Sequence, residues 1–288
     1  MQKKVLVLGV LGMAGHIMAE YLDSTKKYDI FGIAREAKSK YVTKELDITK
    51  YALLEKYLKE IEPDYVINCI GILVAKSNSE LTTAIELNSY LPQYLSKLGK
   101  KYNYKLIQLS TDCVFSGKSG AYVEDDFRDG DDNYARTKAL GEVVNSKDLT
   151  IRTSIIGPEL KTNGTSLLDW FLKQEQKVYG FSKVYWNGVT TLELAKQVDG
   201  FLEQNMTGLF HLCIEKKISK YDLLHLFAKH WSKNIIIENN QNSEVDKSLV
   251  CTREDFIYTK ERPSYEKMLS EMREWMNEHS TFYMHYKG

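Results

Sequence analysis

Residues 4–15 read Lys4-Val5-Leu6-Val7-Leu8-Gly9-Val10-Leu11-Gly12-Met13-Ala14-Gly15. The apolar run that opens this stretch predicts a buried parallel strand, and the apolar periodicity from Met13 to Leu22 predicts a helix. Glycines between a strand and a helix allow a tight turn and a close approach of the backbone to a pyrophosphate at the helix N-terminus. The alternative is a glycine-rich turn without a ligand. We expect a dinucleotide to be bound by Gly9, Leu11, Gly12, Met13 and Gly15.

The first half of the chain continues as an alternation of predicted strands and helices. Strands are expected at Asp29–Ala34, Tyr65–Gly71, Tyr104–Leu109 and Leu149–Ser154. Helices are expected from a cap at Asp47 or Thr49 to Ile61, from about Glu80 to Lys101 with an interruption near Pro92, and around Tyr134 to Lys138. This alternation predicts an α/β fold, a Rossmann-type doubly wound parallel sheet with ligands beyond the carboxyl ends of its strands.

The pattern loosens after Gly157-Pro158. We assign residues 1–157 to an NAD(P)-binding domain and residues 158–288 mostly to a smaller C-terminal α/β substrate-binding domain, whose chain could cross back to the first sheet. Helices are expected at Ser166–Gln174, Thr191–Glu203, Tyr221–Ser232 and Ser264–Asn277, and strands at Leu209–Ile214 and Ile235–Glu238. The tail from Ser280 to Gly288 has no helix stop signal, so it could be disordered or could pack on a partner.

A proton-transfer set follows the fourth predicted strand. Tyr134 and Lys138 are four residues apart, so on a helix they share one face. A nearby ammonium favours the phenolate of a tyrosine, whose pKa is otherwise about 10. Lys138 would therefore tune Tyr134 for proton exchange with a sugar or alcohol oxygen. Thr111 would bind the substrate oxygen. The alternatives are a solvated helix face and a strand-end cap.

The composition limits the classes of partner. The 288 residues are 43% hydrophobic, which supports a sizeable core, and Lys+Arg and Asp+Glu both number 39, so zero net charge gives no sign of nucleic acid or a membrane surface. The four scattered cysteines favour reduced thiols in a cytoplasmic protein, and no metal is expected. The N-terminus reads as a strand rather than a signal peptide, and no apolar run approaches the ~18 residues of a membrane span.

The residue after the second predicted strand bears on the choice of cofactor. Arg35 stands near the position where NAD-binding folds place an acid on the ribose 2′-hydroxyl, and an arginine suits a 2′-phosphate instead. Glu36 is next to it. NADPH is therefore expected, NADH is possible, and a plain surface arginine is the alternative.

Together these residues resemble the extended short-chain dehydrogenase/reductase superfamily, and within it the dTDP-4-dehydrorhamnose reductase branch. The resemblance rests on residues 9–15, 110–117, 134–142 and 151–157. That branch reads Ser-Thr-Asp-Tyr-Val-Phe-x-Gly at the strand end and Tyr-Gly-x-Thr-Lys-x-x-Gly-Glu on the helix. The resemblance implies an NAD(P)H-dependent reductase of the 4-keto group of a nucleoside-diphosphate 4-keto-6-deoxyhexose in surface polysaccharide biosynthesis, as a monomer or homodimer.

The resemblance also places residues in the two binding sites. For the cofactor it implies contacts by Asp47, Ile48, Asn68, Ile70, Gly71, Tyr134 and Lys138, of which Lys138 would hold the nicotinamide ribose. The expected substrate contacts are Thr111, Asp112, Cys113, Ser154, Ile155, Trp186, Asn187 and Arg253, the last of them to a diphosphate. Cys113 replaces a usual Tyr, and Ile155 stands where the rhamnose reductases usually have Trp. We therefore expect the reaction type to be kept and the sugar or its nucleotide to differ.

Two other functions remain open. A nucleotide-sugar epimerase or 4,6-dehydratase of the same superfamily is one, although the dehydratases carry Thr-Asp-Glu where this chain has Thr111-Asp112-Cys113. A non-catalytic NADP-binding sensor is the other. Such proteins generally lose the Tyr or the Lys of the proton-transfer set, and this chain retains both.

Overall fold

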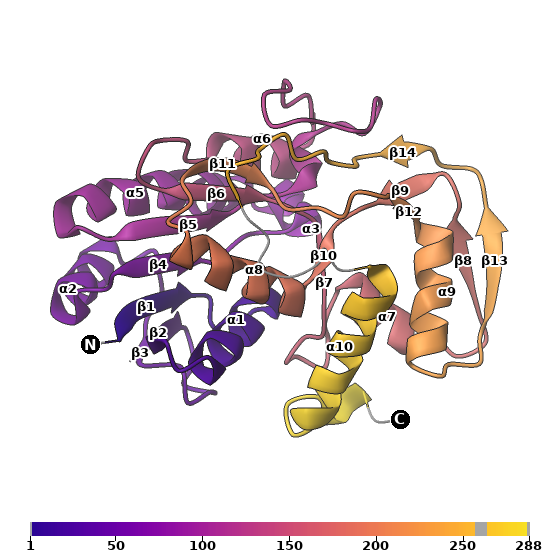
Figure 1. The fold of residues 1–288 in the computed structure, drawn as a ribbon, viewed down its shortest axis with the longest axis horizontal. Helices are drawn as coiled ribbons and strands as arrows, with labels where there is room; N and C mark the ends of the chain where they lie inside the picture. The colour runs from indigo at the N-terminus through magenta and orange to yellow at the C-terminus, as the bar shows by residue number, and fades with distance from the viewer. Residues whose placement is uncertain (1, 257–263, 287–288) are drawn as a thin grey trace.

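The centre of the molecule is a seven-stranded parallel sheet (Figure 1). The computed structural model describes residues 2–256 and 264–286. The strand order is β11-β6-β5-β4-β1-β2-β3, and the strands are β1 (Lys3–Leu8), β2 (Tyr28–Ala34), β3 (Lys44–Glu45), β4 (Tyr65–Asn68), β5 (Lys105–Leu109), β6 (Leu149–Arg152) and β11 (Gly208–His211). This arrangement confirms the predicted α/β doubly wound sheet. Because β11 pairs with β6, the chain returns to the first sheet after residue 158.

Helices on both faces bury the apolar side chains of the sheet. Ile17 of α1 (Met13–Ser24) and Val198 of α8 (Thr191–Glu203) belong to one core, and α1 packs against α8. Leu54 of α2 (Tyr51–Ile61) and Leu95 of α5 (Leu91–Tyr102) belong to the other core. The apolar runs of the central strands, which alternate between these cores, are therefore covered on both sides as parallel strands require.

A second lobe, at the right of Figure 1, is built from short strands and three helices. Its strands are β7 (Ile155–Ile156), β8 (Lys177–Phe181), β9 (Val184–Trp186), β10 (Val189–Thr190), β12 (Ile218–Ser219), β13 (Ile236–Asn240) and β14 (Val245–Asp246). They form three small sheets, β10-β7, β12-β9-β14 and β13-β8. Its helices are α7 (Leu167–Leu172), α9 (Lys220–His230) and α10 (Tyr265–Glu278). None of the described helices is long and apolar enough to cross a membrane.

Two local expectations were wrong. The N-cap of α2 is Lys50, without a side-chain hydrogen bond. Asp47 instead accepts hydrogen bonds from the backbone N–H and the hydroxyl of Thr49, at 3.0 and 2.9 Å, which closes a turn before the helix. The region around residues 80–101 holds α3 (Val74–Ser79), α4 (Leu81–Ala84) and a π-helix over 85–90 that leads into α5. The irregularity therefore precedes Pro92, which sits harmlessly in the first turn of α5.

The C-terminal tail packs on its own chain. A 3-10 turn (Met284–Tyr286) follows α10. The hydroxyl of Tyr283 lies 2.8 Å from Nε2 of His16 in α1, and the hydroxyl of Tyr286 donates to Asp169 Oδ1 in α7 at 2.9 Å. The tail thus joins the helix after the glycine loop to the second lobe.

Candidate active site

The glycine loop leaves the start of α1 open to an anion. Gly9 has a φ of +74°, which a side chain rarely adopts, and its carbonyl accepts a hydrogen bond from the Gly12 N–H at 2.8 Å. A Cβ at Gly15 would overlap the Gly9 carbonyl. Gly12 is the N-cap of α1 and has no side chain to accept from the first-turn N–H groups. This loop, to which Leu11 and Met13 also belong, fits a dinucleotide pyrophosphate.

The exit of β4 forms the neighbouring wall. A Cβ at Gly9 would lie 2.9 Å from Cγ1 of Ile70, so the two loops touch. Asn68 is fully buried, donates to Gln108 Oε1 at 2.8 Å and accepts from the Ile70 N–H at 3.1 Å. Gly71 is exposed, and a Cβ there would lie 3.9 Å from the ammonium of Lys138. The buried Asn68 therefore holds the backbone at Ile70 in place without being exposed itself, and Gly71 lies next to Lys138 of the proton-transfer set.

Arg35 lies exposed after β2. Hydrogen bonds from Thr49 hold the pKa of Asp47 below its ordinary value, and the charge of Arg35 adds to this lowering. Ile48 is buried in the second core. The guanidinium and a carboxylate are thus neighbours at the strand end where a dinucleotide fold holds its adenosine ribose.

Two capped elements bring the proton-transfer set together. The side chain of Thr111 accepts from the Cys113 N–H at 3.1 Å and so caps a 3-10 turn (Asp112–Val114). Helix α6 (Asn133–Leu140) begins after Asp132, whose carboxylate accepts from the Ala135 N–H at 2.7 Å. Near the end of this helix, the Lys138 ammonium donates to the carbonyl of Leu109, the last residue of β5, at 2.6 Å. Lys138 is therefore tied to the strand that delivers Thr111.

Burial dominates the electrostatics of the set, and the pKa of Tyr134 is raised rather than lowered as expected from the nearby ammonium. Burial raises the pKa of Tyr134, the neighbouring Cys113 raises it further, and a hydrogen bond with the Thr111 side chain opposes the rise. Burial lowers the pKa of Lys138 to about 8, against the pull of Glu142. At neutral pH the phenol is therefore protonated while the ammonium on the same helix is charged. The structure thus places Tyr134 in contact with Thr111.

Asn88, on the π-helix, fixes α6 in place. Its side-chain oxygen accepts from the Ile72 N–H at 2.8 Å, and its amide donates to the Ile72 carbonyl at 3.0 Å and to the Thr137 hydroxyl at 3.2 Å. A Cβ at Gly141 would overlap the Asn88 carbonyl, so a glycine is needed for this close approach. Asn88 thereby links the exit of β4 to the helix that carries Tyr134 and Lys138.

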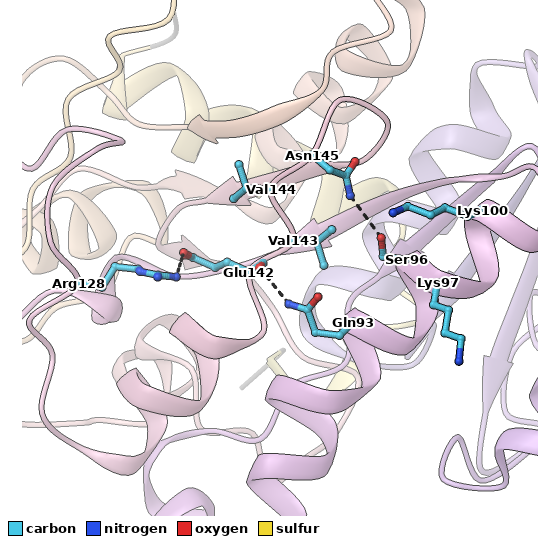
Figure 2. Close-up of a pocket in the computed structure, with 9 residues that line it drawn as sticks. All are labelled: Gln93, Ser96, Lys97, Lys100, Arg128, Glu142, Val143, Val144 and Asn145. Carbon is cyan, nitrogen blue, oxygen red and sulfur yellow. Dashed lines mark hydrogen bonds and ion pairs between the residues drawn. The ribbon is translucent and has the colours of Figure 1, made fainter.

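A buried ion pair between Arg152 and Glu142 holds the residues that follow β5. Arg152 Nε and Nη2 donate to the two carboxylate oxygens of Glu142 at 2.7 and 2.9 Å. Ser110, which precedes Thr111, donates to Glu142 Oε1 at 2.7 Å. Arg128 reaches the same carboxylate from outside at 3.0 Å, as Figure 2 shows. Four polar groups are thus satisfied by one another beneath the proton-transfer set.

His211 extends this network. Its Nδ1 lies 3.0 Å from the Val250 carbonyl and must carry the proton, so Nε2 accepts from Arg152 Nη1 at 3.1 Å. Burial lowers the pKa of His211, consistent with this neutral form.

The hollow in Figure 2 lies on the outer side of Glu142, is lined by residues such as Gln93, Lys97 and Lys100, and includes none of Thr111, Tyr134 and Lys138.

Five of the expected substrate residues, besides Thr111, lie near Tyr134, at the start of β7 or in β9. Asp112 and Cys113 act electrostatically on Tyr134, and Ser154 and Ile155 are partly buried at the start of β7. Burial raises the pKa of Asp112 and brings that of Cys113 to about 12. Trp186 is buried at 2% exposure, with its ring beneath the ammonium of Lys220.

Two of the expected substrate side chains are engaged by other groups of the protein. The Asn187 amide donates to the carbonyls of Ile214 and Leu249 at 3.0 and 2.7 Å, so it joins two backbone segments. Arg253 pairs with Asp255 and donates to the carbonyls of Thr207 and Leu209, at 2.8 and 2.9 Å, beside the amino-terminal end of β11. Ligands of such folds bind at the carboxyl ends of strands. Both side chains are therefore left out of the proposed site.

The RmlD substrate binding domain model matches residues 3–283. The chain belongs to the RmlD substrate-binding-domain family. The RmlD match covers both lobes, so the site and its supporting network lie within the family domain.

Among the described residues, the structure gathers no group of three or more His, Cys, Asp or Glu side chains that could hold a metal ion.

Relatives of this RmlD-family chain include named reductases. The dTDP-4-dehydrorhamnose reductase of Aggregatibacter actinomycetemcomitans is 28% identical over 157 residues, which are 52% of this chain and 51% of that protein. The spore coat polysaccharide biosynthesis protein SpsK of Bacillus subtilis (strain 168) is 26% identical, over 73% of this chain and 72% of its own. A crystal structure of dTDP-4-dehydrorhamnose reductase from Bacillus anthracis in complex with NADP has a TM-score of 0.81 at 18% identity, covering 94% of this chain and 99% of that one. This chain thus spans about half the length of the first curated relative, and the solved structure shows the shared fold.

Three parts of this RmlD-family site could not be settled from the sequence. Asn88 could be either a filler of its predicted helix or a proton-relay residue, and its hydrogen bonds with Ile72 and Thr137 depend on the fold. Glu142 and Arg152 stand in the quoted motifs, yet their pairing depends on the tertiary fold. Lys220 follows the N-cap Ser219, a place where a lysine opposes the helix dipole. That conflict is the one local signal that could have identified it.

Proposed function

We propose that this chain is an NAD(P)H-dependent reductase of the 4-keto group of a nucleoside-diphosphate 4-keto-6-deoxyhexose, acting in surface polysaccharide biosynthesis. The observation that carries the proposal is the placement of Thr111, Tyr134 and Lys138 at the end of β5, next to a glycine loop open to a pyrophosphate. The names of the relatives, two of which are a dTDP-4-dehydrorhamnose reductase and a spore coat polysaccharide protein, support the substrate class.

The residues present fit a nicotinamide dinucleotide. The 9–15 loop would hold the pyrophosphate at the start of α1. Arg35 would hold the 2′-phosphate of the adenosine ribose, and Asp47 and Ile48 would contact the adenine. Lys138, beside Gly71, would hold the nicotinamide ribose. When bound, the reduced nicotinamide supplies a hydride to the carbonyl carbon.

Two side chains, Tyr134 and Thr111, would act on the substrate oxygen, and Lys138 would act on Tyr134. Tyr134, whose raised pKa keeps it protonated, donates its phenolic proton to that oxygen. The Lys138 ammonium, charged below its pKa of about 8, stabilises the phenolate that remains. The Thr111 hydroxyl binds the same oxygen and limits the charge that builds on it.

The chemistry of Cys113 favours a reductase over a dehydratase. Elimination requires a base at this position, and burial raises the pKa of the Cys113 thiol to about 12. A neutral thiol does not supply that base. The sensor function is disfavoured by the intact contacts around Tyr134 and Lys138.

The substrate class is tested with a panel of 4-keto-6-deoxy nucleotide sugars, scored by NADPH oxidation. Cys113 and Ile155 replace a Tyr hydroxyl and a Trp ring, which leaves a roomier pocket for a ring with, for example, a 2-acetamido group on a UDP carrier. We expect a better substrate than the dTDP-rhamnose precursor. If the dTDP compound has the highest kcat/KM, the pocket argument is wrong, and if no compound oxidises NADPH, the reductase function is wrong.

Replacing Arg35 tests the choice of cofactor. Loss of the guanidinium in Arg35→Ala removes a charge-assisted contact with the 2′-phosphate, so the Kd for NADPH should rise about 10- to 150-fold. The Kd for NADH should change little, because NADH lacks that phosphate. Fluorescence titration of both cofactors measures the difference, with the exposed Arg136→Ala as the matched control. Equal losses for both cofactors would show that Arg35 does not read the phosphate.

A further inference from the structure

Lys220, the first residue of α9, places an ammonium beside the proposed substrate site. Its Nζ lies 5.5 Å from the centroid of the Trp186 ring. The titratable neighbours that act on it are Asp112 and Cys113, which also act on Tyr134. Lys220 and the proposed proton donor therefore border the same residues at the end of β5.

Three features make this position unfavourable for an ammonium in the free protein. Lys220 is partly buried, and a cation at a helix N-terminus opposes the helix dipole. Among residues 2–256 and 264–286, none forms a hydrogen bond or ion pair with its Nζ, whereas nearby Lys217 pairs with Asp246. Removing a charge from water without a partner costs free energy. A ligand that brings an anion would supply the missing partner.

A second lysine, Lys247, acts on the same two residues, Asp112 and Cys113. It follows β14 in the chain. The described part of the chain gives Lys247 no hydrogen bond or ion pair of its own. Two ammonium groups against the single carboxylate of Asp112 leave an excess of positive charge, which favours an anionic ligand.

We propose that Lys220, supported by Lys247, binds a negatively charged oxygen of the substrate, either a phosphate oxygen of the nucleotide carrier or a carboxylate on the sugar. The proposal rests on the function proposed above, which makes the substrate a nucleotide sugar. Arg253, the cation expected from the sequence, is committed to Asp255 and two carbonyls. Trp186 would hold the Lys220 ammonium in place through a cation–π contact. Lys220 thus selects the substrate and takes no part in proton transfer.

The test is a calorimetric titration of the NADP⁺-saturated protein. The probes are UDP, dTDP and GDP, the matching nucleosides, and UDP-glucose compared with UDP-glucuronic acid. Lys220→Met keeps the chain length and removes the charge, and should weaken binding of the anionic probe about 10- to 100-fold. Nucleoside and NADP⁺ binding should be unchanged. Lys217→Met, which loses an exposed lysine of the same segment, is the matched control.

The outcomes separate the two sources of the anion. Weaker binding of the nucleoside diphosphates identifies the phosphate, and a loss confined to UDP-glucuronic acid identifies a sugar carboxylate. Lys220→Arg keeps the charge and should bind within a few-fold of wild type. Equal affinities of wild type and Lys220→Met, or an arginine variant as weak as the methionine one, would overturn the assignment. If the wild-type protein binds none of the nucleotides, the proposed function fails first and this assignment fails with it.

Discussion

Tyr134→Phe is expected to lower the rate of hydride transfer about 10²- to 10⁴-fold, because it removes the group that protonates the substrate oxygen. The ring stays, so the substitution removes only the hydroxyl, which is the group that bonds with Thr111. The expected Kd for NADPH is nearly unchanged, since the proposed contacts of the glycine loop, Arg35 and Lys138 with the cofactor remain. Single-turnover kinetics with the best substrate of the panel measures the chemical step apart from binding.

The control for this variant is Tyr179→Phe, which removes a hydroxyl from a tyrosine that is 53% exposed in the second lobe. It should keep the wild-type rate. A Tyr134→Phe protein that turns over at nearly the wild-type rate would mean that another group supplies the proton.

Arg152→Met is expected to lower the free energy of unfolding by about 3–5 kcal/mol, because it leaves the Glu142 carboxylate buried without its bidentate partner. Arg128 and Ser110 remain as partners of the carboxylate, which places the loss in this range rather than above it. Urea unfolding followed by circular dichroism measures the change as a lower midpoint.

A second replacement tests the reason for this loss. In the double variant Glu142→Gln/Arg152→Met the orphaned charge is gone, so part of the stability should return. The exposed Arg136→Met should unfold like wild type. If Arg152→Met unfolds at the wild-type midpoint, the buried ion pair does not support the strand end as described.

Most of the central sheet could be predicted from the sequence because strands such as β1, β4 and β5 are buried runs rich in apolar residues that alternate with helices, whereas β3, the exposed pair Lys44–Glu45, was not predicted. The run at Val5–Leu8 and the periodicity of α1 are local signals, and the structure confirms both. The second lobe was harder, since β7, β10, β12 and β14 have two residues each and carry no periodicity. The π-helix at residues 85–90 was not predicted either, and it holds the buried Asn88 and Ser89.

The site was predictable where chemistry requires a fixed spacing. Tyr134 and Lys138 share a helix face at any packing, and Thr111 follows directly from a predicted strand. Polar residues outside such motifs could not be assigned, since their roles depend on which backbone groups they meet after folding. Asn187 and Arg253 satisfy carbonyls in the structure, and no pattern in the sequence distinguishes them from residues that face a ligand.

Transfer of deuterium from labelled cofactor tests the proposed reaction most directly. The protein is incubated with NADPH deuterated at the transferable position of the nicotinamide and with the best 4-keto-6-deoxy nucleotide sugar of the panel. Mass spectrometry and proton NMR of the product locate the label. The account predicts one deuterium on C4 of the sugar, where the carbonyl has become a hydroxyl. A product without deuterium, or with deuterium at another carbon, would contradict the assignment as a 4-keto reductase.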